Sequence, residues 1–201
     1  MAKPWLEGVR KSGKLTVYDG LTSGRWVHLF KAALEGFNEV SKRYGLGVTM
    51  AKAADEKSAN VVMRVSSGVA SYEYDGTTIS GSFDGKRLHG YTMLFGREGE
   101  PQIEKAVVFL PSDPRSPAGF IRGKEVFEKA NLDMMKVVAV HELIHACGLE
   151  NEDHSDDGVF CAAIVPTGTG KVKAWGKKDA RAMPPLFLIP STASKVASLW
   201  S

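Results

Sequence analysis

The chain has 201 residues, of which 43% are hydrophobic and 24% are charged, a composition typical of one folded domain with a sizeable core. The formal net charge is +3 and no long basic run is present, so we expect neither a nucleic acid nor a membrane as partner. No segment has the length of a transmembrane helix, and residues 1–14 lack the apolar stretch of a secretory signal. We therefore expect a protein that is cytoplasmic as synthesised, or one that is carried in a phage particle or exported by a non-classical route.

The first predicted elements are a strand and a long helix. Residues 14–19 alternate between polar and apolar side chains as a half-buried strand does, and Gly20 ends the run. From Trp26 to Tyr44 the apolar residues recur at spacings of three and four, which predicts an amphipathic helix that ends at Gly45. Residues 66–87 are rich in Gly, Ser and Tyr and predict a loop or a loose hairpin. Short apolar runs predict further strands of one sheet at residues 48–51, 60–65, 88–95 and 106–110.

The second half of the chain is predicted to hold two more helices. Three prolines within residues 111–117 predict a loop, after which a second helix is expected from about Lys124 to Cys147. Gly148 supplies its stop, and residues 191–200 predict a closing helix. The fold class expected from this order is α+β, with two long helices and one sheet.

We expect a single domain over residues 1–201. Its N-terminal subdomain, at about residues 14–148, would contain the sheet and the second long helix. A small irregular C-terminal subdomain would follow at about residues 149–201. The oligomeric state is not set by any sequence pattern.

The clearest chemical motif lies near the end of the second long helix, where the sequence is apolar except for His141, Glu142 and His145. The two histidines are four residues apart, about 40° around a helix axis, so both imidazoles can bind one metal ion. Zinc accepts neutral imidazole nitrogen, and a catalytic zinc needs three protein ligands and a position for water. Glu142 can take a proton from that water and later pass it to a leaving amine. The pattern predicts a zinc-dependent peptidase; the alternative is that the histidines are core residues satisfied without a metal.

The third zinc ligand is expected just after the helix. Once the helix stops at Gly148, a short loop can return His154 to the open side of the metal, which gives three nitrogen ligands. Asp153 is the rival ligand, whereas Asn151 is neutral and a poor zinc ligand. The remaining interpretation of His154 is an exposed loop histidine.

These residues resemble the metzincin metallopeptidases, and among them the matrixin-like members. The resemblance is carried by His141, Glu142, His145 and Gly148. In that family the third histidine follows the glycine by three residues, a position that Asn151 occupies here. Aligning His154 with it requires a three-residue insertion in the loop.

The resemblance implies a single catalytic domain of metzincin-like α+β fold, with a mixed twisted sheet, two long helices and an active-site cleft, and it implies a way of binding substrate. A peptide or protein substrate would lie extended along an exposed sheet edge above the zinc, pairing through main-chain hydrogen bonds, and residues 88–95 would be that edge. The family also has a methionine beneath the metal, but the matching residues 158–161 contain none, so Phe160 or Cys161 would form the apolar floor. Some relatives use a later tyrosine, but none follows Tyr91 here.

Three functions are kept open by these departures. The first is a zinc endopeptidase with Zn²⁺ on His141, His145 and His154 and with Glu142 as general base. The second is a structural module of a phage particle or secretion assembly that has kept the fold and lost turnover. The third keeps the hydrolysis and changes the substrate to the peptide of peptidoglycan. Cys147 is expected to be a buried apolar residue that needs no disulfide to Cys161.

Overall fold

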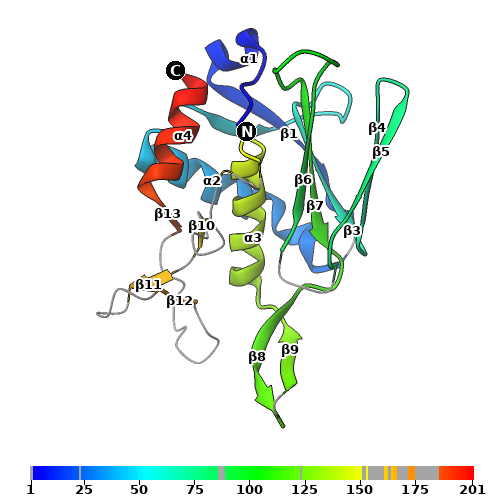
Figure 1. The fold of residues 1–201 in the computed structure, drawn as a ribbon, viewed down its shortest axis with the longest axis vertical. Helices are drawn as coiled ribbons and strands as arrows, with labels where there is room; N and C mark the ends of the chain where they lie inside the picture. Colours follow the sequence, from blue (N-terminus) through cyan, green and yellow to red (C-terminus); the bar gives the residue numbers. More distant parts are fainter. Residues whose placement is uncertain are drawn as a thin grey trace.

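The structure is a computed structural model that describes residues 2–22, 24–85, 89–122, 124–150, 153, 161–162, 164–166, 172–174 and 186–201. Its centre is a mixed sheet of five strands in the order β2-β1-β3-β7-β6 (Figure 1). All neighbouring strands run parallel except β6, which is an edge strand antiparallel to β7. The strands are β1 (Lys14–Gly20), β2 (Thr49–Lys52), β3 (Val61–Ser66), β6 (Tyr91–Phe95) and β7 (Lys105–Pro111).

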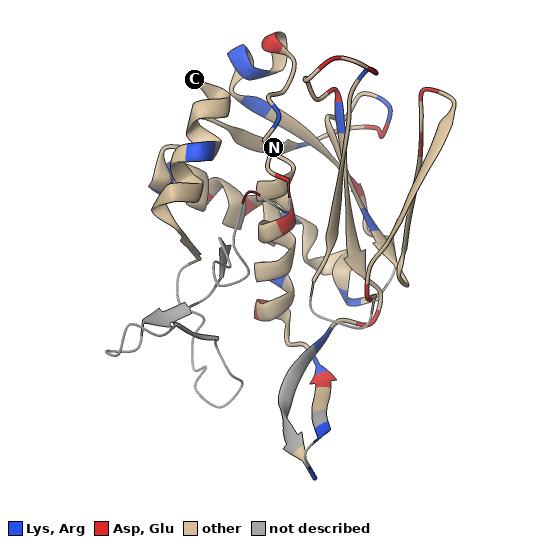
Figure 2. Ribbon diagram, viewed as in Figure 1, with Lys and Arg blue, Asp and Glu red and all other residues tan. Residues whose placement is uncertain are grey.

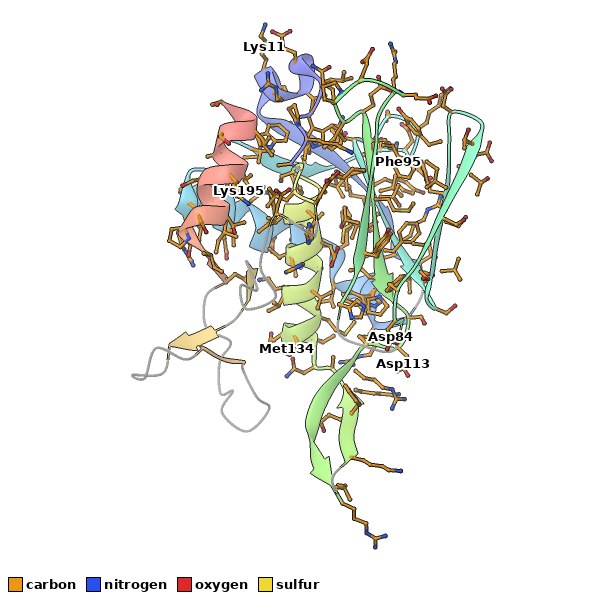
Figure 3. All side chains as sticks on the ribbon, viewed as in Figure 1. Lys11, Asp84, Phe95, Asp113, Met134 and Lys195 are labelled. Atoms are coloured by element: carbon orange, nitrogen blue, oxygen red, sulfur yellow. The ribbon has the colours of Figure 1, made fainter. Side chains whose placement is uncertain are left out.

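Helices cover one face of this sheet. The two long ones, α2 (Phe30–Tyr44) and α3 (Leu132–His145), pack against each other and against the main apolar core. Gly36 on α2 allows the close approach, because a Cβ atom there would lie 2.7 Å from Cε of Lys136 on α3. Figure 3 shows side chains filling the space between α3 and the sheet. Two shorter helices, α1 (Glu7–Ser12) and α4 (Pro190–Trp200), lie near the two ends of the chain (Figure 1).

The other face of the sheet is covered by the hairpin of β4 (Val69–Tyr74) and β5 (Thr77–Ser82). A second apolar cluster joins Ala70 of the hairpin to Val62, Met93, Phe95, Val107 and Phe109 of the sheet. The sheet is therefore buried on both faces around β7, which explains why β7 is buried along its whole length and why residues 106–111 form one continuous apolar run.

Most of the elements predicted from the sequence are confirmed. The strand at the start, the four later strands and the closing helix are present, and the segment of residues 66–87 contains a hairpin. The first long helix begins later than predicted, at Phe30, because Gly24–His28 form a separate 3-10 turn. Its end is as predicted, since Gly45 adopts a left-handed conformation with φ of 62°.

The prediction of a helix from about Lys124 was wrong. The chain there forms a hairpin of β8 (Arg115–Ile121) and β9 (Lys124–Lys129), which projects from the body of the molecule in Figure 1. Arg122 turns the chain with φ of 51°. The helix begins only after Asn131, whose side chain accepts a hydrogen bond from the backbone N–H of Met134 at 2.8 Å.

The described pieces near the C-terminus are short strands and a helix. β10 (Cys161–Ala162) pairs with β13 (Phe187–Leu188) and contacts α3, and β11 (Ile164–Pro166) pairs with β12 (Val172–Ala174). Basic and acidic segments are interspersed over the described residues, as Figure 2 shows. None of the helices within the described residues is both long and apolar enough to cross a membrane. The structure is thus α+β with a mixed sheet, as expected.

Candidate metal centre

The two histidines of the motif lie side by side on α3. Their ring centroids are 5.0 Å apart with an angle of 62° between the ring planes. His145 is buried, with 3% of its surface exposed, and His141 is half-buried. The spacing of one helical turn has therefore brought two imidazoles to one place at the border of the core, which is the arrangement that two ligands of one metal ion require.

The ring of His145 is oriented by the backbone that follows the helix. Its Nδ1 lies 2.9 Å from the carbonyl oxygen of Leu149. Because a carbonyl can only accept, Nδ1 carries the proton of the neutral ring, and a metal ion would be bound by Nε2. Gly148 makes the necessary turn with φ of 118°, and a side chain there would collide with the carbonyl oxygen of Lys3.

Both ends of the chain hold the last turn of α3. The indole N–H of Trp5 donates to the carbonyl of Ala146 at 2.9 Å, and the indole N–H of Trp200 donates to the carbonyl of Cys147 at 3.1 Å. The backbone N–H of Lys3 donates to the carbonyl of Gly148 at 2.8 Å. These donors satisfy carbonyls that a helix end leaves without partners, so the residues just after His145 have a fixed path.

Glu142 points from α3 toward the edge strand. Its Oε1 accepts the backbone N–H of Gly90 at 3.2 Å, and its Oε2 accepts the hydroxyl of Thr92 at 2.7 Å. Only 4% of the surface of Glu142 is exposed. Burial raises the pKa of this carboxyl from 4.5 to about 7, against the opposing effect of the two hydrogen bonds. A carboxyl with a pKa near neutrality is suited to general acid–base chemistry.

The alternation of the edge strand explains why Thr92 reaches Glu142. Tyr91, Met93 and Phe95 belong to the cluster under the β4–β5 hairpin, so Thr92 projects toward the opposite face, where α3 lies. The edge strand is predicted from the sequence, whereas the contacts of Gly90 and Thr92 with Glu142 are not. The sequence pattern that indicates the second contact is the hydroxyl of Thr92 on the helix-facing side of a mostly apolar strand.

The expected third ligand, His154, lies outside the described residues, as does Phe160. The rival ligand Asp153 is described, and its carboxylate is engaged elsewhere: Oδ2 accepts the backbone N–H of Glu150 at 3.0 Å and Oδ1 lies 3.7 Å from Nζ of Lys195. Within the part of the chain that the structure describes, no three His, Cys, Asp or Glu side chains are grouped to hold a metal. Asp153 therefore does not complete the site in this structure.

Cys147 and His89 lie close to His145 and Glu142 in the sequence or the fold, and each contacts other groups. Cys147 is a free, buried cysteine, and burial raises the pKa of its thiol, in line with an apolar role. His89 precedes Gly90 along the chain, but its ring lies against Phe83, with 6.3 Å between ring centroids. Phe83 packs against the apolar cluster on the far face of the sheet.

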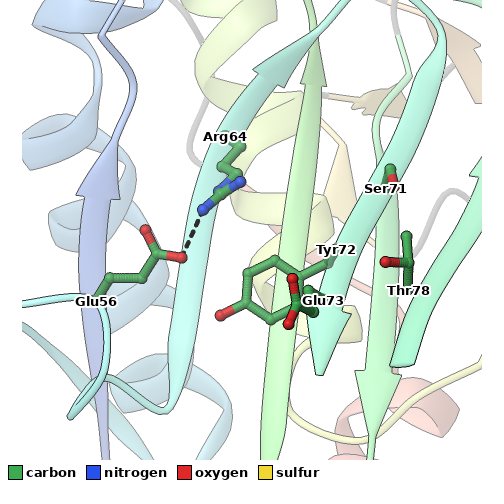
Figure 4. A pocket seen from close by; sticks show the side chains of 6 residues that line it. All are labelled: Glu56, Arg64, Ser71, Tyr72, Glu73 and Thr78. Atoms are coloured by element: carbon green, nitrogen blue, oxygen red, sulfur yellow. Dashed lines mark hydrogen bonds and ion pairs between the residues drawn. The ribbon is translucent and has the colours of Figure 1, made fainter. Parts of the chain in front are cut away.

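A pocket of about 450 Å³ also lies on the far face, between β3 and the β4–β5 hairpin (Figure 4). Glu56 and Arg64 form an ion pair of 2.5 Å at this pocket, and Arg64 lies over the ring of Tyr72 at 5.2 Å. The remaining lining residues are Ser71, Glu73 and Thr78. This polar network is separated from His141 and His145 by the sheet.

No model of a known protein family matches this chain, and a comparison with curated proteins finds no relative.

Proposed function

We propose that this protein is a zinc-dependent peptidase in which His141, His145 and His154 bind Zn²⁺ and Glu142 is the general base. The observation that carries the proposal is the position of Glu142. Its carboxyl is buried on the same helix as two adjacent imidazoles and is hydrogen-bonded to the edge strand of the sheet. Burying a carboxyl costs stability, and such groups occur preferentially at functional sites.

The donor set fits zinc rather than a harder metal ion. Two neutral imidazoles, one of them oriented by a backbone carbonyl, are ligands that zinc accepts in catalytic sites. Calcium and magnesium prefer oxygen ligands, whereas the buried carboxyl of Glu142 is turned to the sheet. A third nitrogen from His154 would leave the fourth position to water.

The arrangement of the sheet supports a metzincin-like peptidase. That resemblance implied a substrate-binding sheet edge beside the helix that carries the histidines, and β6 is an edge strand that contacts α3. An extended peptide can add to such an edge by main-chain hydrogen bonds. The substrate we infer is therefore an unfolded or extended segment of a protein.

This placement gives zinc, Glu142 and the edge strand different roles in the proposed reaction. Zinc, when bound, would polarise the attacked carbonyl and the attacking water. Glu142 would remove a proton from that water and return it to the amine that leaves when the peptide bond breaks. The edge strand would hold the peptide in line with Glu142.

The direct test is hydrolysis of fluorescently labelled casein by the full chain loaded with one equivalent of zinc. We expect Glu142→Gln to retain zinc and to lower kcat by about 100-fold or more. Glu39→Gln, the same change at an exposed position of α2, should leave both quantities unaltered. Equal cleavage by Glu142→Gln and the parent would refute the role of Glu142.

The same measurements separate the other candidate functions. A parent chain that binds no zinc and cleaves nothing would favour the structural module. A chain that binds zinc and releases peptide fragments from purified peptidoglycan, but not from casein, would favour the cell-wall substrate.

A further inference from the structure

The hydroxyl of Thr92 lies between two acceptor atoms of Glu142. It is 2.7 Å from Oε2 and 3.1 Å from the backbone carbonyl oxygen. That carbonyl already accepts the N–H of Ala146 at 3.0 Å as part of the helix. A hydroxyl has one proton, so the shorter contact makes the ionised side chain its acceptor.

The carboxyl group is held at both oxygens. The backbone N–H of Gly90 contacts Oε1 and the hydroxyl of Thr92 contacts Oε2; Thr92 lies on β6 and Gly90 directly precedes that strand. Two hydrogen bonds from a rigid element fix the rotation of a carboxylate, which one bond would not do. The inner face of β6 thus sets the direction in which Glu142 points.

We propose that Thr92 is a positioning residue for Glu142, so that the strand expected to bind the substrate also aims the base. This inference rests on the proposed peptidase function. It predicts that the hydroxyl of Thr92 affects turnover through Glu142 and has no direct effect on zinc or substrate binding. A general base that is misplaced by about 1 Å can lose as much as 100-fold in rate.

The kinetic test compares two substitutions in the zinc-loaded full chain, with labelled casein as substrate. Thr92→Val keeps the shape and removes the hydroxyl; we expect kcat to fall about tenfold, with KM and zinc content unchanged. Thr92→Ser restores the hydroxyl and should recover most of kcat. If Thr92→Ser is as slow as Thr92→Val, the methyl group and not the hydroxyl matters, and the proposal is wrong.

Thr16→Val is the matched control. Thr16 lies on strand β1 and its hydroxyl donates to Oδ1 of Asn60 at 2.9 Å, so this variant also loses a strand hydroxyl with a hydrogen bond. It should lose stability to a similar degree and keep the parent kcat. A loss of kcat as large as that of Thr92→Val would show that the effect is general destabilisation, which would overturn the positioning role.

A second measurement does not depend on catalysis. In a double-mutant cycle of Thr92→Val and Glu142→Met, followed by urea unfolding of the full chain in chelator, we expect the two substitutions to be coupled by about tenfold in the unfolding constant. Additive effects would overturn the positioning role. If the two substitutions are coupled but the parent chain has no peptidase activity, the contact between Thr92 and Glu142 is real and the proposed function is wrong.

Discussion

Nδ1 of His145 lies 2.9 Å from the carbonyl oxygen of Leu149, four residues further along the chain. This contact joins the Nδ1 side of the ring to the turn that follows α3. It also fixes which ring nitrogen is presented to a metal ion, because the proton on Nδ1 leaves Nε2 as the ligand atom.

The tautomer of His145 is therefore a prediction for the zinc-loaded protein. Two-bond ¹⁵N–¹H correlation spectra should show a protonated Nδ1 and a metal-bound Nε2 for this residue. A protonated Nε2 in the zinc-loaded chain would contradict the orientation that we infer from Leu149.

The tryptophans that hold the end of α3 are predicted to support zinc binding. Trp5→Phe removes the donor to Ala146 and leaves a buried carbonyl without that partner, which should cost about 1 to 3 kcal/mol of unfolding free energy. Because the turn after His145 loosens, zinc affinity should also fall, by about tenfold. Urea unfolding and competition with a fluorescent chelator measure the two effects.

Trp26→Phe is the control for that prediction. The indole N–H of Trp26 donates to the carbonyl of Pro111 at 2.6 Å, and the side chain is as deeply buried as that of Trp5. The loss of stability should be similar and zinc affinity should stay at the parent value. If both variants weaken zinc binding equally, the end of α3 has no special role.

A glycine at position 90 is predicted to be required for activity, because the structure leaves no room for a side chain there. A Cβ atom at this position would lie 2.5 Å from Cγ of Glu142 and 2.8 Å from the carbonyl oxygen of Phe109. Gly90→Ala should therefore displace the carboxyl and lower kcat by about tenfold or more. Gly8→Ala, where no atom lies within 4 Å of the added methyl group, should retain full activity in the same casein assay.

The raised pKa of Glu142 predicts how stability depends on pH in the chelated protein. The folded state binds this proton more tightly than the unfolded state, whose carboxyl keeps the ordinary value of 4.5. The contribution to stability is fully present below that value and is lost as the pH rises through about 7. From about pH 4 to about pH 8 the loss should be about 3 kcal/mol relative to Glu142→Gln.

Urea unfolding of the parent and of Glu142→Gln at several pH values measures this loss. The difference between the two proteins matters, because other carboxyl groups titrate equally in both. A difference that does not change with pH would mean that Glu142 is not a buried acid.

The parts of the fold that the sequence predicts are those with a strong apolar period. α2 shows the period of a helix, and residues 106–111 of β7 form one apolar run because both faces of the sheet are covered there. The β8–β9 hairpin is not predicted from the sequence because Lys124–Lys129 has few apolar residues. Asn131, a residue type that caps helices, marks the start of α3 better than Lys124 does.

The candidate site also has a part that the sequence predicts and a part that it does not. The spacing of His141 and His145 is a local property of one helix, so the sequence alone predicts that the rings meet. The contact of Thr92 with Glu142 joins residues that are 50 positions apart in the chain. They meet only because β6 packs against α3 in the folded protein. No local pattern encodes such a contact.

The most direct test of the proposed zinc site is an anomalous difference map, recorded at the zinc absorption edge, from crystals of the full chain grown with zinc. We predict one strong peak at roughly 2.0 to 2.1 Å from Nε2 of His145 and from one ring nitrogen each of His141 and His154. Zinc bound elsewhere, with no peak between His141 and His145, would contradict the proposed function.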